Sequence, residues 1–151
     1  MIRLAFDLGT YCGVAWSEKD DGSEVKYTCL NLSSKGHEGG GMRYLKFRQF
    51  LTTFVLTPDV VYYELVARHK GTAAAHVYGG LQAVLMAWCE ENNIPYTGIA
   101  VQTIKKHATG KGNASKDMMI EAARKEFGYE GSDDNEADAI WVLDCGMSQQ
   151  V

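Results

Sequence analysis

Three acidic residues stand at the ends of elements that the sequence pattern predicts. Asp7 closes a short apolar segment, and Glu64 follows the apolar run Val60–Tyr63. Asp138 lies in the first turns of a helical pattern near the C-terminus. Three converging carboxylates repel one another, and hard divalent cations such as Mg²⁺ or Mn²⁺ relieve that repulsion. Two such ions at one site can direct water against a phosphodiester.

Each acid taken alone is most often a solvated residue at the end of a strand or helix. The three together, each at the end of a predicted element, favour a metal site over that interpretation. Phosphodiester hydrolysis by two metal ions needs no cysteine, serine or histidine nucleophile, and the sequence offers no obvious one. We therefore predict metal-dependent hydrolysis, with Asp7, Glu64 and Asp138 as the ligands.

The elements that must position these acids follow from hydrophobic periodicity and turn residues. If the first and fourth strands are neighbours, Asp7 and Glu64 project from one edge of the sheet, and the last helix brings Asp138 to them. An early run of strands followed by alternating helices and strands predicts a mixed sheet with helices on its faces. The pattern predicts strands over 2–7, 11–17, 24–32, 59–65 and 95–100, and helices over 42–56, 72–92, 114–127 and 132–145.

Size and composition restrict the class of protein. The 151 residues fit one compact domain, and no segment approaches the ~20 apolar residues of a membrane span. An acid at position 7 is incompatible with the apolar region of a signal peptide, so we expect a soluble, cytoplasmic protein. Its four cysteines are scattered, and we expect them to be reduced and packed as small apolar residues.

The net charge of −4 is unusual for a protein that binds DNA. The distribution matters more than the sum, because basic residues gather between Val66 and Lys116 while acids gather elsewhere. A local basic surface is therefore compatible with the negative total. The loop Gly110–Gly112 lacks the pattern of a nucleotide-binding loop, and we interpret it as a contact to the DNA backbone or as a plain flexible loop.

The motifs resemble those of the RuvC family of Holliday-junction resolvases. The opening segment Leu4–Ala15, with Asp7 in it, looks like that family's first catalytic motif, and Glu64 after its apolar strand looks like the second. Gln102–Lys105 with Gly110–Lys116 looks like the stretch that carries two basic residues near the scissile phosphate. Asn135–Ala139 looks like the final acidic motif. The resemblance covers nearly the whole chain in order and spacing.

The resemblance implies an α/β protein with the RNase H-like fold, a mixed five-stranded sheet with helices on both faces in a single nuclease domain over residues 1–151. It implies two Mg²⁺ ions, replaceable by Mn²⁺, and a homodimer that cuts two strands of a four-way DNA junction in a bacterial or phage-infected cell. Lys116 and Lys105 would neutralise charge on the phosphate. The DNA contacts that we predict are Arg68, His69, Lys70, Lys105, Lys106 and Lys111.

Two departures from the family pattern qualify this interpretation. The family often has an acid three residues before its last aspartate, and here that residue is Asn135, which we predict as a metal ligand ahead of Asp134. Bacterial members carry an aromatic residue soon after the second catalytic acid, whereas this chain has Val66–His69. We therefore expect junction opening and sequence preference to differ. The compact size resembles phage-encoded relatives.

The helix predicted over Thr72–Asn92 is apolar nearly all round, so its stripe of Tyr78, Leu81, Leu85 and Trp88 is either core or a dimer face. Three alternative functions compete with this interpretation. An ATP-binding domain of the actin and sugar-kinase type needs a second domain, for which the chain is too short. A non-catalytic nucleic-acid-binding module does not explain three intact acids. A nuclease of the same fold that cuts RNA–DNA hybrids or flaps stays open.

Overall fold

The computed structural model describes residues 1–149 and contains a mixed sheet of five strands. The strands lie in the order β3-β2-β1-β4-β5. The first three form an antiparallel meander, and β4 and β5 run parallel to β1. This is the mixed five-stranded sheet predicted from the sequence. The bounds are β1 (Arg3–Asp7), β2 (Tyr11–Ser17), β3 (Lys26–Asn31), β4 (Val60–Leu65) and β5 (Tyr96–Ala100).

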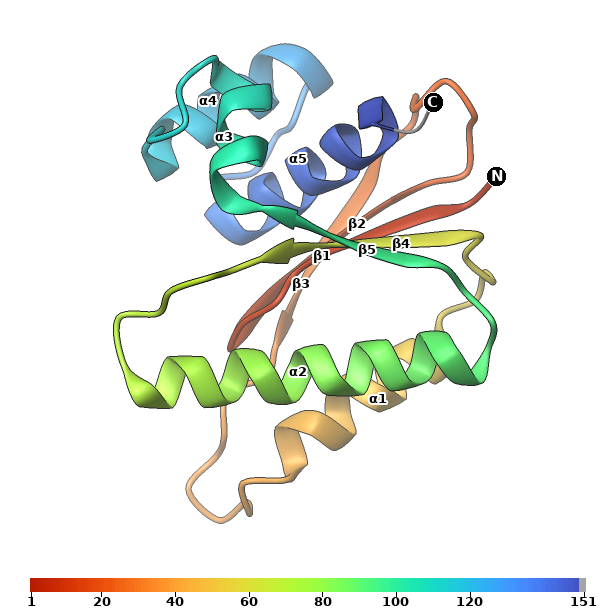
Figure 1. Cartoon of the computed structure of the whole chain (residues 1–151), viewed down its shortest axis with the longest axis vertical. Helices are drawn as coiled ribbons and strands as arrows, with labels where there is room; N and C mark the ends of the chain where they lie inside the picture. The colour runs from red at the N-terminus through yellow and green to blue at the C-terminus, as the bar shows by residue number, and fades with distance from the viewer. Residues whose placement is uncertain (150–151) are drawn as a thin grey trace.

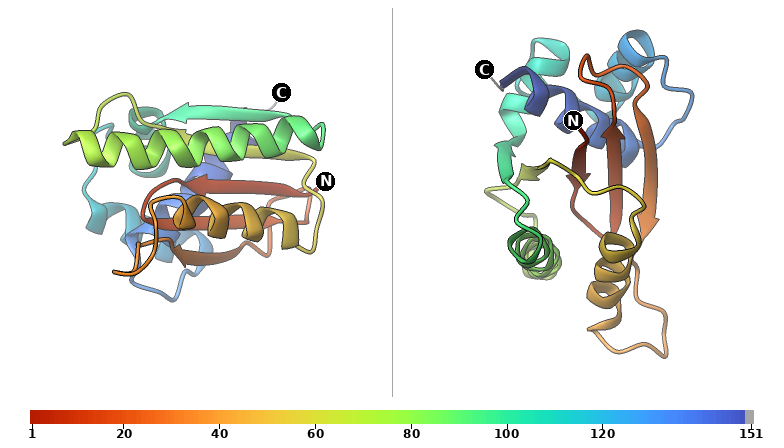
Figure 2. Two further views of the ribbon diagram at one scale, coloured as in Figure 1. Left: turned by 90° about the horizontal axis from the view of Figure 1, so that it is seen from below. Right: turned by 90° about the vertical axis from the view of Figure 1, so that its right-hand side faces the viewer.

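Helices cover both faces of the sheet, as predicted. Figure 1 shows α1 and α2 below the sheet and α3, α4 and α5 above it, and the right-hand view of Figure 2 shows the same layers from the side. None of the helices within residues 1–149 combines the length and apolar character that a membrane span requires. The bounds are α1 (Met42–Thr53), α2 (Thr72–Glu91), α3 (Val101–Thr109), α4 (Lys116–Phe127) and α5 (Asp134–Gln149).

Helix α3 is the one element of these ten that the sequence pattern did not predict. It is short, and Ile104 is its only buried residue. Its apolar residues Val101, Ile104 and Ala108 have helical spacing, but a helix of 9 residues is shorter than the window of about 11–18 residues over which periodicity identifies a helix. The other differences concern ends. The helix predicted to reach Leu56 stops at Thr53, and the helix predicted to stop at Cys145 continues to Gln149.

The stripe on α2 belongs to the core. Tyr78, Leu81, Leu85 and Trp88 are at most 6% exposed, and they pack with residues of β1, β4 and α1. The interpretation of this stripe as core is therefore confirmed, and its interpretation as a dimer face is wrong for these side chains. The expectation for the cysteines also holds, because all four are unpaired and three of them are buried.

The alternation of side chains along β1 and β4 decides where the acids point. Ala5 and Tyr62 belong to the core between the sheet and α5. Successive side chains of a strand point to opposite faces, so residues two apart share a face. Asp7 and Glu64 lie two residues beyond Ala5 and Tyr62. Both acids are therefore directed to the face that α5 covers.

Candidate active site

Adjacent parallel strands bring the first two acids together. In the pairing of β1 with β4, Phe6 stands opposite Tyr63, and the next residues along the two strands are Asp7 and Glu64. Both strands end at this edge of the sheet. Ligand sites of open α/β sheets lie at the carboxyl ends of parallel strands. The predicted neighbourhood of the first and fourth strands is therefore confirmed.

Gly13 allows α5 to approach these acids closely. It pairs with Asp7 across the β1–β2 ladder. A Cβ atom at this position would collide with the backbone carbonyl of Asn135 in the first turn of α5. The carboxylate of Asp133 accepts a 2.8 Å hydrogen bond from the backbone N–H of Asn135 and fixes the start of that turn. Asp138 follows one turn later and faces the strand ends.

The three carboxylates form one cluster. One oxygen from each of Asp7, Glu64 and Asp138 lies within 4.8 Å of the other two, and all three residues are half-buried. Burial raises the pKa of Asp7 well above its usual value, and the charges of Glu64 and Asp138 raise it further. Burial, followed by the charges of Glu64 and Asp134, raises the pKa of Asp138 to about 7. A cluster of hard oxygen donors that resists full ionisation fits a divalent cation.

Two of the predicted lysines stand beside the acids. Lys105 from α3 and Lys116 from α4 line a cavity of about 140 Å³ together with Glu64 and Asp138. Their positive charges partly oppose the rise in the pKa of Asp138, and Lys105 does the same for Glu64, whose pKa is raised by burial. A phosphate at the acids would therefore lie within reach of two ammonium groups, one on each helix.

The residue before Asn135 also acts on the cluster. The charge of Asp134 raises the pKa of both Asp7 and Asp138. Its carboxylate lies 3.5 Å from the Nζ atom of Lys116, whose side chain is 80% exposed. Asn135 is half-buried in the first turn of α5, and its backbone faces Gly13. The structure thus brings the charge of Asp134 to the acids, and the metal-ligand role of Asn135 stays a prediction.

Tyr78 contacts the backbone on both sides of Leu65, directly after Glu64. Its hydroxyl donates a 2.8 Å hydrogen bond to the carbonyl oxygen of Glu64 and accepts one of 3.2 Å from the N–H of Val66. The ring of His69 packs on Tyr78 at 4.8 Å between centroids. The sequence identified Tyr78 only as an apolar stripe residue. No sequence signal relates residues 64 and 78, because the contact depends on how α2 docks on β4.

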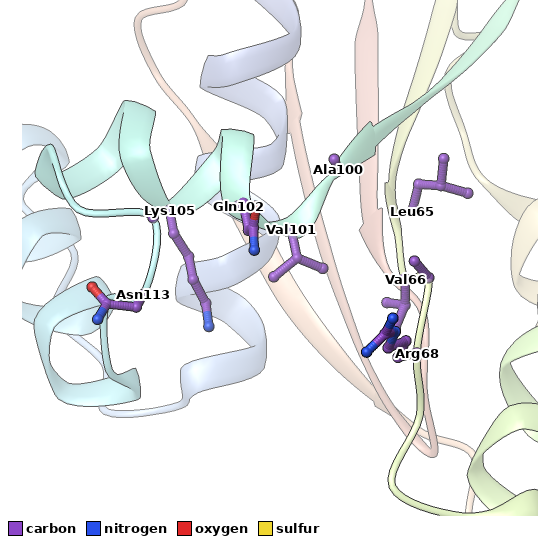
Figure 3. Close-up of a pocket in the computed structure, with 10 residues that line it drawn as sticks. Leu65, Val66, Arg68, Ala100, Val101, Gln102, Lys105 and Asn113 are labelled. Atoms are coloured by element: carbon purple, nitrogen blue, oxygen red, sulfur yellow. The ribbon is translucent and has the colours of Figure 1, made fainter.

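The other predicted DNA contacts lie in different places. Arg68 and Lys105 line a groove of about 620 Å³ beside the acid cluster, and Figure 3 shows their side chains in it. His69 is half-buried against Tyr78. Lys70, Lys106 and Lys111 are exposed and line neither this groove nor the cavity at the acids. The structure therefore brings Arg68 and Lys105 to the site and leaves the other lysines on the surrounding surface.

Comparisons with known proteins agree on the fold. No protein-family model and no curated protein matches the sequence. The structure of Thermus thermophilus RuvC in complex with a Holliday junction substrate matches with a TM-score of 0.79 and 16% identity, over 96% of this chain and 92% of that chain. A second Thermus thermophilus RuvC structure matches with a TM-score of 0.71 and 18% identity over the same shares. The similarity of the two structures to this chain confirms the predicted RNase H-like fold.

Proposed function

We propose that this chain is a structure-selective endodeoxyribonuclease that resolves four-way and other branched DNA junctions by metal-dependent phosphodiester hydrolysis. The observation that carries the proposal is the convergence of Asp7, Glu64 and Asp138, with one oxygen of each within 4.8 Å of the others. The similarity to RuvC supports the choice of substrate, since one matching structure holds a Holliday junction.

The acids and the lysines of the site have different roles in this proposal. Asp7, Glu64 and Asp138 would hold two Mg²⁺ ions, or Mn²⁺ in their place, and Asn135 would add a neutral oxygen ligand. When bound, the two ions supply an activated water and stabilise the charge on the leaving oxygen. Lys116 stabilises negative charge that develops on the phosphate during cleavage, because its ammonium lines the same cavity as Glu64 and Asp138. Lys105, which lines the same cavity from α3, holds the DNA backbone.

Branched DNA would lie over the edge of the sheet that carries the acids. Arg68 and Lys105 contact the strand next to the scissile phosphate, and His69 supports the same loop from its place on Tyr78. Lys70, Lys106 and Lys111 contact phosphates further away. Such backbone contacts supply affinity that depends on salt but not on sequence. The acidic total of the chain is then no obstacle, because the groove that Arg68 and Lys105 line contains no acid.

Two symmetric cuts in a four-way junction require two active sites related by a two-fold axis, so we propose a homodimer. The α2 helix stays the proposed contact, but through its outer side, where Ala83 and Ala87 are exposed. Ala87→Glu should give monomers that lose coordinated double cutting, while Tyr78 and Leu81 are unsuitable for this test because they are core residues. A wild-type mass of one chain at micromolar concentration, with full activity, would refute the dimer.

The experiment is an assay of purified protein on a synthetic four-way junction, a linear duplex and an RNA–DNA hybrid, with Mg²⁺ and with EDTA. We expect cleavage of the junction in Mg²⁺ only, by nicks that a ligase can seal. Junction binding without cleavage would indicate a non-catalytic module. Preferred cleavage of the hybrid would indicate a different nuclease of the same fold.

A further inference from the structure

A groove of about 620 Å³ adjoins the acid cluster (Figure 3). Its walls come from the chain that leaves β4, the start of α3 and the loop before α4. The groove shares Val101 and Lys105 with the cavity that contains Glu64 and Asp138. A DNA strand with its phosphate at the acids therefore continues directly into this groove.

The charge of the groove suits a strand of nucleic acid. The residues that line it include Arg68 and Lys105 and no acid, although the chain as a whole carries a net charge of −4. The acid cluster next to it has the opposite character. A phosphodiester backbone is attracted to the cations, so the occupant favoured by charge is the nucleotide that flanks the scissile phosphate.

The remaining lining is suited to a nucleobase. Val66 and Val101 present apolar surface, and Gln102 and Asn113 carry side-chain amides. An amide group both donates and accepts hydrogen bonds, as the edge of a base does. A Cβ atom at Gly112 would stand 3.8 Å from the carbonyl oxygen of Gln102, so the loop that carries Asn113 packs directly beside α3. Both amides are exposed and therefore open to a ligand.

We propose that this groove binds one unpaired nucleobase next to the scissile phosphate, and that Gln102 and Asn113 determine which base is accepted. The inference rests on the proposed function and deepens it. The groove is a recess beside the acids that is open to solvent, and a base that is stacked and paired within a duplex cannot enter it. Unstacking costs least where pairing is already interrupted, as at the centre of a branched junction. Binding of a base in the groove thus couples cleavage to branched DNA.

The test uses junctions that carry an abasic site, or each of the four bases, at every position flanking the cut. In the wild type we expect one position at which the abasic site slows single-turnover cleavage by about tenfold, the effect of losing a base contact. At that position Gln102→Leu and Asn113→Leu should each reduce the base preference several-fold. Gln49→Leu, an exposed glutamine on α1, is the matched control and should keep the preference.

A second readout separates this inference from the proposed function. The fluorescent base 2-aminopurine at the sensitive position should brighten when the protein binds a junction in Ca²⁺, because unstacking relieves its quenching. Cleavage that no flanking position influences, or a preference that survives both leucine variants, would overturn the inference and leave the proposed function intact. If no substrate is cut, the proposed function fails. In that case 2-aminopurine is placed in turn at each position around the branch point, where a fluorescence change that Gln102→Leu removes supports the groove and the absence of any such change refutes it.

Discussion

The two faces of the sheet use the same strands for different purposes. On the face covered by α1 and α2, β1 and β4 present Phe6 and Tyr63, which are at most 4% exposed in an apolar core. On the face covered by α5, the next residues along these strands are Asp7 and Glu64, beside Asp138. The first face stabilises the fold through apolar burial. The second places partly buried carboxylates together, which opposes folding as long as they are charged and unpaired.

Tyr78 connects these two faces. It lies in the core of the α1–α2 side, yet its hydroxyl bonds to the backbone at Glu64 and Val66. The stabilising face thus supports the position of an acid on the other face. The geometry of the site therefore depends on the opposite layer, and variants of the two faces should separate stability from chemistry.

The largest expected effect is the loss of cleavage when a clustered acid is neutralised. Asp7→Asn, Glu64→Gln and Asp138→Asn should each abolish junction cleavage while junction binding persists, because each removes a metal-binding charge and leaves the DNA surface. Leu85→Ala on the other face is the contrast. It should cost about 2–5 kcal/mol of stability and leave the rate of the folded protein nearly unchanged. Near-normal cleavage by any of the three acid variants would remove that residue from the site.

The next effect concerns the lysine on α4. Lys116→Ala should slow single-turnover cleavage at saturating protein by roughly 10²–10³-fold, since a charge aimed at the developing negative phosphate is lost. Lys111→Ala is the control. It should weaken binding and reduce the salt slope by about one unit, with little change in the saturated rate. An unchanged saturated rate for Lys116→Ala would refute the catalytic role of this lysine.

A smaller effect is expected at the connection between the faces. Tyr78→Phe keeps the buried ring and removes the hydroxyl that holds the backbone of Glu64, so it should raise the Mg²⁺ concentration for half-maximal cleavage by about 10- to 100-fold. Tyr44→Phe is matched to it, because the Tyr44 hydroxyl bonds only to the backbone of α2, at His76. If both variants lose stability alike and neither shifts the Mg²⁺ requirement, Tyr78 has a structural role only.

The smallest difference in activity separates the two neighbours at the start of α5. We predict that Asn135→Asp is tolerated and that Asn135→Ala slows cleavage more than Asp134→Ala, because residues 135 and 138 lie on one helix face. The charge of Asp134 raises the pKa of Asp7 and Asp138, so Asp134 is the other candidate for the ligand role. The reverse ranking of the two alanine variants would assign the ligand role to Asp134.

The sequence predicted most of the fold and the acids of the site for a physical reason. The apolar runs before Asp7 and Glu64 identify two strands from local sequence alone. Because parallel strands end at the same edge of a sheet, the acids at their ends could be placed together. The sequence missed α3 because its 9 residues are too few for helical periodicity to be recognised. It also missed the role of Tyr78, which depends on the docking of α2. Local patterns identify elements and their ends, whereas contacts between distant elements appear only once the layers are packed.

The raised pKa of Asp138 makes the stability of the folded protein depend on pH. In the folded protein that pKa is about 7, against an ordinary value of 3.8. Between these values the folded state binds protons that the unfolded state has lost, so stability falls as the pH rises from about 4 to about 7 and stays lower above it. We expect Asp138→Asn to remove this loss of stability, and we expect Mg²⁺ to offset it in the wild type by binding the folded state.

The most direct test is therefore the free energy of unfolding of the wild type and Asp138→Asn at pH 8, in EDTA and in Mg²⁺. In EDTA we expect the variant to be more stable by roughly 1–3 kcal/mol, with the difference vanishing near pH 4. In Mg²⁺ the wild type should gain stability and the variant should gain much less. Two results would contradict a metal site formed by Asp7, Glu64 and Asp138. One is that Mg²⁺ does not change the stability of the wild type, and the other is that the variant is less stable than the wild type in EDTA.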